Sequence, residues 1–161
     1  MLRLTAQFRL YNGDLYDPAS VTVKVTPNTG TEVTAEAVRE DLGLYYYDYT
    51  PGNEVYIVVE FTGETVILRH KLLVDTSYRS LLRITSSAMD EEIIDLVDAA
   101  LGDMGLSGVE NLTIDANIKR AISLYLKWQF GYDNPDADRL QRAYESLKGH
   151  LSLAGDYNAV E

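Results

Sequence analysis

The chain has 161 residues and a formal net charge of −11, with 25 acidic and 14 basic side chains. Proteins that hold nucleic acid through its phosphates are usually basic, so this balance argues against a protein that wraps DNA or RNA. The absence of cysteine excludes disulfides and argues against zinc or iron–sulfur centres with thiolate ligands. The two histidines, His70 and His150, lie in different halves of the sequence. We therefore expect no metal site and no cofactor.

The first residues do not have the pattern of a secretory signal. Arg3, Thr5, Gln7 and Arg9 interrupt any apolar run there, whereas a signal peptide needs a continuous apolar segment. No stretch of the sequence approaches the length of a membrane-spanning helix. We expect a protein without a membrane partner that stays in the cytosol until it is assembled into a larger structure.

Residues 1–75 alternate between apolar and polar side chains, which is the period of half-buried strands. Turn-forming pairs such as Asn12-Gly13, Pro27-Asn28 and Pro51-Gly52 interrupt this alternation. Six strands are predicted, near residues 4–10, 21–26, 33–37, 44–50, 55–61 and 66–72. Short strands at this spacing predict an antiparallel β-sandwich over residues 1–75.

One predicted strand is rich in tyrosine. Its surroundings, Gly43-Leu44-Tyr45-Tyr46 and Tyr49-Thr50-Pro51, resemble the small immunoglobulin-like modules of many phage structural proteins. Tyr45, Tyr47 and Tyr49 share one face of the strand. Such a row packs across strands when it is buried and stacks on sugars or a protein partner when it is exposed. We favour packing; the alternative function is an immunoglobulin-like carbohydrate or host-surface binding module on a helical anchor.

A polar segment, Asp75-Thr-Ser-Tyr-Arg-Ser80, marks the predicted boundary between the β half and a helical half. We predict a linker over residues 76–88 and a helical domain over residues 89–161. The fold class is therefore α+β with segregated halves. Residues 81–84 fit either a short extra strand or the approach to the first helix.

The first two helices of the helical domain follow from apolar residues that recur at helical spacing. The first is predicted to start at a capping box formed by Ser87 and Asp90 and to continue to Met104. The second is predicted to start near Thr113 or Asp115.

The third helix is predicted to follow a corner at residues 130–135. Gly131 can adopt the left-handed conformation that closes a helix. Asn134 is the candidate N-cap, and Pro135 suits the first helical position. Apolar residues then recur at helical spacing as far as Leu151, so the domain has three helices.

No set of catalytic residues can be assembled from the sequence. The segment 105–108 lacks the second glycine of a nucleophile elbow, because Val109 stands in its place. The aspartates in 133–138 fail the EF-hand pattern, because Pro135 or Arg139 occupies a required position. We predict that the protein is not an enzyme.

The end of the chain carries a second resemblance. The runs Trp128-Gln-Phe-Gly-Tyr-Asp-Asn-Pro135 and Leu147-Lys-Gly-His-Leu-Ser-Leu153 resemble the end of the head–tail connector (adaptor) proteins of long-tailed bacteriophages and prophages. The likeness covers about residues 87–157. It implies a structural protein of the virion neck, a twelvefold ring of subunits beneath the portal, and no catalysis.

The same resemblance implies the partners of the chain. These are other copies of itself, the portal protein, the next neck or tail-completion protein, and genomic DNA that passes without sequence-specific binding. Before assembly the protein would lie in the host cytoplasm. The candidate interface and structural residues belong to this part of the chain: Trp128, Phe130, Tyr132, Pro135, Tyr144, Leu147, Leu151 and Tyr157.

Overall fold

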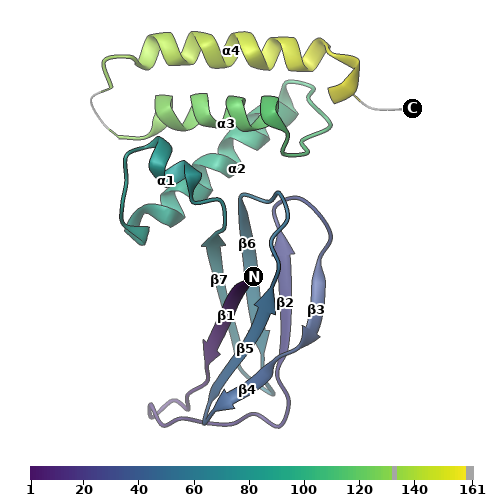
Figure 1. The fold of residues 1–161 in the computed structure, drawn as a ribbon, viewed down its shortest axis with the longest axis vertical. Helices are drawn as coiled ribbons and strands as arrows, with labels where there is room; N and C mark the ends of the chain where they lie inside the picture. Colours follow the sequence, from purple (N-terminus) through teal and green to yellow (C-terminus); the bar gives the residue numbers. More distant parts are fainter. Residues whose placement is uncertain (132–133, 159–161) are drawn as a thin grey trace. The chain divides into compact units, whose positions relative to one another are not determined.

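The computed structural model describes residues 1–131 and 134–158 of the chain (Figure 1). The chain divides into two compact units, Met1–Val74 and Asp75–Glu161. The first unit consists of antiparallel strands in two sheets, and the second is helical with three main helices. The predicted order, an antiparallel β region followed by a helical region, is therefore confirmed.

The β unit, all of which is described, contains seven strands. They are β1 (Leu2–Gln7), β2 (Thr22–Pro27), β3 (Val33–Glu36), β4 (Val38–Asp41), β5 (Leu44–Tyr49), β6 (Tyr56–Thr62) and β7 (Ile67–Leu73). One sheet has the order β1-β5-β4 and the other the order β3-β2-β6-β7. This arrangement is sandwich-like, as predicted, while the immunoglobulin-like topology stays a prediction.

Alternation along the strands buries apolar side chains in one core. Val23 and Val25 of β2 lie opposite Phe61 and Val59 of β6, and all four side chains are fully buried. Full burial of one such side chain stabilises the folded state by about 1.5–3 kcal/mol. The same core contains further buried residues from both sheets and the segments next to their strands: Leu4, Ala6, Phe8, Val21, Tyr45, Tyr49 and Ile57. The period-two prediction is confirmed for these strands.

The strand predicted over residues 33–37 is present as β3, but the separate strand that follows it, β4, was not predicted. β3 pairs with β2, whereas β4 pairs with β5 in the other sheet, so the chain changes sheets between Glu36 and Val38. Ala37 marks the crossing, where its N–H donates to the carbonyl of Val21 at 2.9 Å. All side chains of β4 are exposed. Its residues therefore do not alternate between buried and exposed positions, which is the pattern used to predict a strand.

The first strand ends earlier than the predicted range of residues 4–10. β1 ends at Gln7, and the Leu10 side chain is exposed. Beyond the strand, the N–H of Leu10 donates to the carbonyl of Asp14 at 2.8 Å, and the N–H of Gly13 donates to the carbonyl of Leu10 at 2.9 Å. A tight turn therefore begins where the alternation still suggested a strand.

The tyrosine row of β5 faces the core of the β unit. Tyr45 and Tyr49 are buried, and Tyr47 is partly buried against the same core. The hydroxyl of Tyr45 donates to the carbonyl of Pro18 at 3.1 Å, and that of Tyr49 donates to the carboxylate of Glu54 at 2.8 Å. The packing interpretation is confirmed, and the row does not form an exposed stacking surface.

The helical unit contains, in its described residues, four α-helices and two short 3-10 helices: α1 (Ser77–Leu81), η1 (Ser87–Met89), α2 (Asp90–Leu106), α3 (Ala116–Gln129), α4 (Ala137–Leu153) and η2 (Gly155–Tyr157). Residues 76–88, the expected linker, hold α1 and the start of η1. α3 contacts both α2 and α4, and α3 and α4 run side by side in opposite directions (Figure 1). Their buried residues form the core: Ile93, Ile94, Val97, Ala100, Met104, Ile118, Ala121, Ile122, Leu126, Tyr144 and Leu151.

Side-chain caps define where two helical segments start. Asp115, one of the two predicted starts, is the N-cap of α3, and its carboxylate accepts from two backbone N–H groups of the first turn at 2.9 and 2.8 Å. Before α2 the cap is Ser86, whose hydroxyl accepts from the N–H of Ala88 at 3.1 Å and opens η1. The predicted Ser87–Asp90 capping box is therefore wrong, because Ser87 is already inside η1.

The corner before α4 differs in part from the prediction. Gly131 has a φ of +85°, which is the left-handed conformation expected there. α4 begins at Ala137, so Pro135 lies in the turn before the helix and not at its first position. The side-chain oxygen of Asn134 accepts from the N–H of Asp136 at 3.0 Å. This Asx turn satisfies the backbone locally and delays the start of the helix.

Candidate interaction surface of the helical unit

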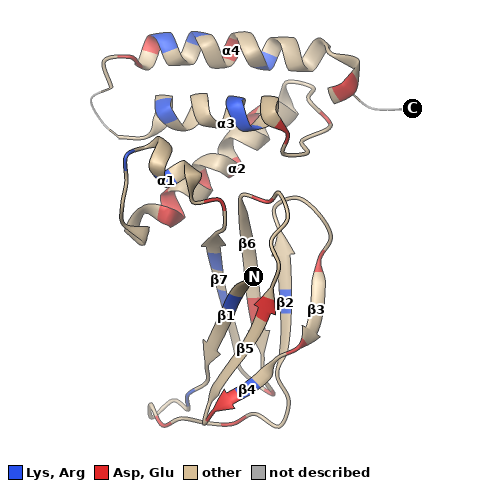
Figure 2. Cartoon of the chain, viewed as in Figure 1, with Lys and Arg blue, Asp and Glu red and all other residues tan. Residues whose placement is uncertain are grey.

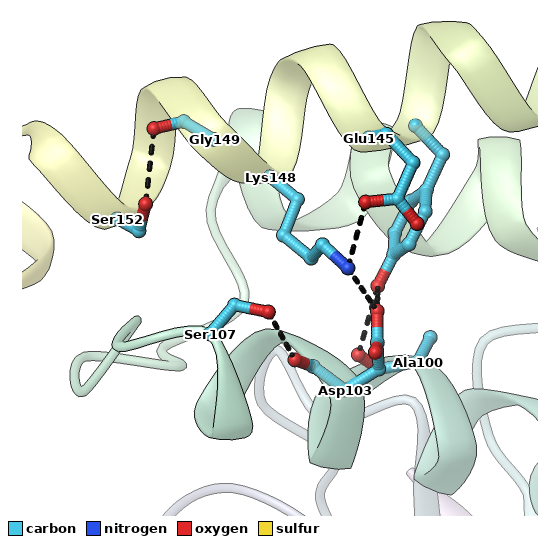
Figure 3. A network of polar contacts seen from close by, with 8 residues as sticks. Ala100, Asp103, Ser107, Glu145, Lys148, Gly149 and Ser152 are labelled. Carbon is cyan, nitrogen blue, oxygen red and sulfur yellow. Dashed lines mark hydrogen bonds and ion pairs between the residues drawn. The ribbon is translucent and has the colours of Figure 1, made fainter.

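A polar network joins α2 to α4 (Figure 3). The Tyr144 hydroxyl donates to Oδ2 of Asp103 at 2.7 Å, and Nζ of Lys148 lies 2.8 Å from the same oxygen. Lys148 also pairs with Oε2 of Glu145 at 2.9 Å. Because Tyr144 is fully buried, leaving its hydroxyl without a partner would cost about 1–3 kcal/mol. The network therefore helps to hold α4 on α2.

Burial and hydrogen bonding have opposite effects on the two charges of this network. Burial alone would raise the pKa of the Asp103 carboxyl, but hydrogen bonds from Lys148 and Tyr144 outweigh it and leave that pKa below its usual value. Burial alone would lower the pKa of Lys148, but its bonds to Asp103 and Glu145 raise it. Asp103 and Lys148 are therefore both charged at neutral pH.

Aromatic rings pack where α3 meets α4. The ring centre of Tyr125 lies 5.5 Å from that of Trp128 and 5.1 Å from that of Tyr144, both in edge-to-face geometry. Trp128 and Tyr144 are themselves 6.2 Å apart. Each such pair contributes about 0.5–1.5 kcal/mol beyond the burial of its surface. The structure thus brings together two of the predicted residues, Trp128 and Tyr144, between the helices.

A groove of about 600 Å³ opens where α3 ends and α4 begins. We call it the basic groove, because Arg83, Lys127 and Arg139 line it. Its remaining lining includes the predicted residues Phe130 and Pro135, together with Leu81, Leu82, Gly131, Asn134, Asp136 and Leu140. The groove combines apolar and positively charged side chains in a chain that is acidic as a whole. This chemistry suits a protein partner that presents both apolar side chains and carboxylates.

Tyr157 forms hydrogen bonds at the end of the helical unit that lies opposite the groove. Its hydroxyl donates to the carboxylate of Asp115, and the side-chain amide of Asn117 donates to that hydroxyl at 3.0 Å. Its carbonyl accepts from the N–H groups of Glu110 at 2.8 Å and Asn111 at 3.1 Å. The hydrogen bond to Asp115 raises the pKa of Tyr157. Tyr157 therefore joins the turn after α2, the start of α3 and the end of α4.

The other candidate residues lie apart from the groove or outside the described residues. Leu151 is buried and Leu147 is partly buried on α4, while Tyr132 lies outside the described residues. Sequence reasoning missed Asp103 and Lys148, because an aspartate on the polar side of one helix gives no sign that another helix reaches it. It also missed the three groove cations, which come from separate segments of the chain.

The fold and these surfaces define a class of protein. Among the residues that the structure describes, no three His, Asp or Glu side chains gather as a metal-binding group. No helix in the described ranges is long and apolar enough to span a membrane. The features that do stand out are a three-helix core, a polar network between helices and a basic groove. They define a small helical module that follows an antiparallel β unit.

The model of the phage connector protein family matches residues 76–158, just over half of the chain. The chain therefore belongs to this family, whose members are structural, non-enzymatic components of the virion at the head–tail junction. The predicted resemblance is confirmed, and the match begins before residue 87, so it includes α1. No curated protein and no solved structure matches the chain.

Proposed function

We propose that this chain is a head–tail connector subunit that forms a ring beneath the portal and lines the passage for the genome. The family match over the helical unit carries this proposal. The ring would be twelvefold, as the resemblance to head–tail connectors implies. The portal protein would contact one side of the ring, and the next neck or tail-completion protein would contact the other.

The size of the helical core supports a subunit that assembles. Three helices of this length bury a small core, and small cores leave little margin for independent stability. Copies that pack side by side would enlarge the buried surface of each unit. A ring of identical subunits provides such neighbours for every copy.

The charge of the chain supports a passive role toward DNA. The net charge is −11, and Asp and Glu residues are distributed over elements of both units (Figure 2). Acidic walls repel the phosphates of a duplex, and tight sequence-specific binding needs basic side chains instead. The genome would therefore pass through the ring without being held.

Cryo-electron microscopy of virions tests the proposal most directly. A tag fused to the chain should appear at the neck, and the map should show a ring between portal and tail into which the helical unit fits. Localisation of the tag to the capsid shell or to the tail tip would contradict the proposal. We do not propose the alternative carbohydrate-binding function, because Tyr45 and Tyr49 are buried in the β unit.

A further inference from the structure

Two cations of the basic groove, Arg83 and Lys127, have no ion-pair partner among the described residues. Arg139 pairs with Asp136 at 3.2 Å, in a contact that is itself exposed. Within the described residues, Arg83 and Lys127 therefore present positive charge that a carboxylate of another subunit can meet.

Arg83 occupies a backbone position that usually belongs to glycine. Its φ is +60°, and the N–H groups of Arg83 and Ile84 donate to the carbonyls of Ser80 at 3.1 Å and Arg79 at 2.9 Å. This is the Schellman pattern that ends a helix, in which glycine is preferred at the left-handed position. An arginine there is strained, and such strain is concentrated at functional sites. The chain therefore places a charge in the groove at some expense to its own stability.

The opposite end of the helical unit presents complementary chemistry. Leu106 and Leu153 are 93% and 83% exposed, and Glu110 and Asp156 are exposed as well. The N–H of Glu110 donates to the carbonyl of Tyr157 at 2.8 Å, which joins the turn after α2 to the end of α4. Neither carboxylate has an ion-pair partner within the described part of the chain. We call Leu106, Glu110, Leu153 and Asp156 the leucine end.

The basic groove and the leucine end lie at opposite ends of the antiparallel pair α3–α4 (Figure 1). α4 has 17 residues and therefore spans about 25 Å, so a subunit cannot fill its own groove. A contact between two different surfaces of identical subunits is heterologous. It repeats from copy to copy and closes as a ring when the rotation between neighbouring copies permits closure.

We propose that the basic groove of one subunit binds the leucine end of the next copy of this chain. Leu106 and Leu153 would pack on the apolar lining of the groove, and Glu110 and Asp156 would face its cations. A second copy is the occupant because the chain itself supplies both complementary surfaces, at the two ends that a ring contact requires. This inference rests on the proposed function and specifies the contact between its subunits.

Charge reversal on each side tests this contact. The full-length variants R83E/K127E and E110K/D156K, each mixed with purified portal and followed by native mass spectrometry, should self-associate at least about 100-fold more weakly than the wild type, because like charges then face each other. An equal mixture of the two variants should regain assembly, since each reversed groove meets a reversed leucine end. The control R120E/R142E changes the charge equally outside the groove and should assemble as the wild type does.

Disulfide cross-linking tests the same contact with variants that keep every charge of the chain. The chain has no cysteine, so L82C in the groove and L153C in the leucine end each introduce a single thiol. Oxidation of the assembled double variant should give a ladder of disulfide-linked oligomers. A mixture of the two single variants should give dimers and nothing larger, and neither single variant should cross-link by itself.

The possible outcomes separate this contact from the proposed function. Wild-type assembly by R83E/K127E, with no cross-links in the cysteine experiment, overturns the contact and leaves the connector function standing. Loss of portal binding with intact self-association assigns the groove to the portal and also overturns the contact. A wild-type chain that joins neither its copies nor the portal removes the function and the contact together.

Discussion

The two units use the same polar contact, a tyrosine hydroxyl bound to a carboxylate, over different separations in the sequence. In the β unit Tyr49 donates to Glu54, five residues away, at 2.8 Å. In the helical unit Tyr144 donates to Asp103, 41 residues away, at 2.7 Å. The first contact stabilises a local turn, whereas the second joins two helices. The β unit also has a long-range contact of this kind, in which Tyr16 donates to Glu64, 48 residues away, at 2.7 Å. That contact is exposed, whereas the Tyr144 side chain of the helical contact is fully buried.

The largest expected effect is the loss of core packing in the β unit. Phe61 is fully buried, so F61A should destabilise the β unit by about 3–5 kcal/mol through lost burial and a residual cavity. Trp128 is the single tryptophan of the chain and lies in the helical unit, so its fluorescence follows that unit alone. Denaturant titration should show an early loss of the β-sheet circular dichroism with the Trp128 transition unchanged. An equal shift of both transitions would contradict the separation of the units.

Removal of the Tyr144 and Tyr49 hydroxyls tests whether each tyrosine–carboxylate contact stabilises only its own unit. Y144F should lower the stability of the helical unit by about 1–3 kcal/mol, because the Asp103 carboxylate then loses a buried donor. Y49F should have an effect of similar size that is confined to the β unit. The Trp128 transition should shift in the first variant and not in the second. Y11F is the control, because Tyr11 is fully exposed, and it should shift neither transition.

The pH dependence of stability should show that the negative charge of Asp103 stabilises the helical unit. Hydrogen bonds from Lys148 and Tyr144 outweigh burial and place the pKa of Asp103 below its unfolded value, which is about 3.9. A lowered pKa stabilises the folded state above the unfolded pKa, and this contribution is lost as the pH falls through the folded pKa. D103N should therefore be less stable than the wild type at pH 7, and the difference should shrink on acidification below about pH 4.

This pH experiment has a matched control in D138N, which removes one exposed carboxylate from α4. Asp138 lies in the first turn of α4, so D138N should lower the stability seen by Trp128 fluorescence by only about 0.3–1 kcal/mol at pH 7, through the helix dipole. If D103N is less stable than the wild type by the same free energy of unfolding from pH 7 to pH 3, the Asp103 charge does not contribute to stability.

The smallest expected effect is a gain of stability at Arg83. R83G should stabilise the helical unit by about 1 kcal/mol or less, because glycine adopts a positive φ without strain while its greater freedom in the unfolded chain offsets part of the gain. The same variant should weaken assembly, because the groove loses a cation. R83K keeps both the charge and the strained backbone, so its stability should match the wild type in thermal unfolding. A less stable R83G would contradict the strain argument.

Several elements could be predicted from the sequence because their signals are local. Val23, Val25, Val59 and Phe61 alternate with polar residues, and a period of two defines a buried face whatever the partner strand is. Asp115 was recognisable as a helix start because a cap acts on the next three residues. The corner at residues 130–135 identified the family for the same reason, since its pattern lies in consecutive residues.

Which surfaces meet became visible only in the folded structure. The change of sheets at Ala37, the contact between Asp103 and Lys148, and the gathering of the groove cations all join residues that are distant in the chain or depend on a partner strand. Periodicity tells which face of a helix or strand is buried, but the element that covers that face is selected by packing across the whole unit. For this reason the three main helices could be predicted from their spacing, whereas the basic groove that lies between the ends of α3 and α4 could not.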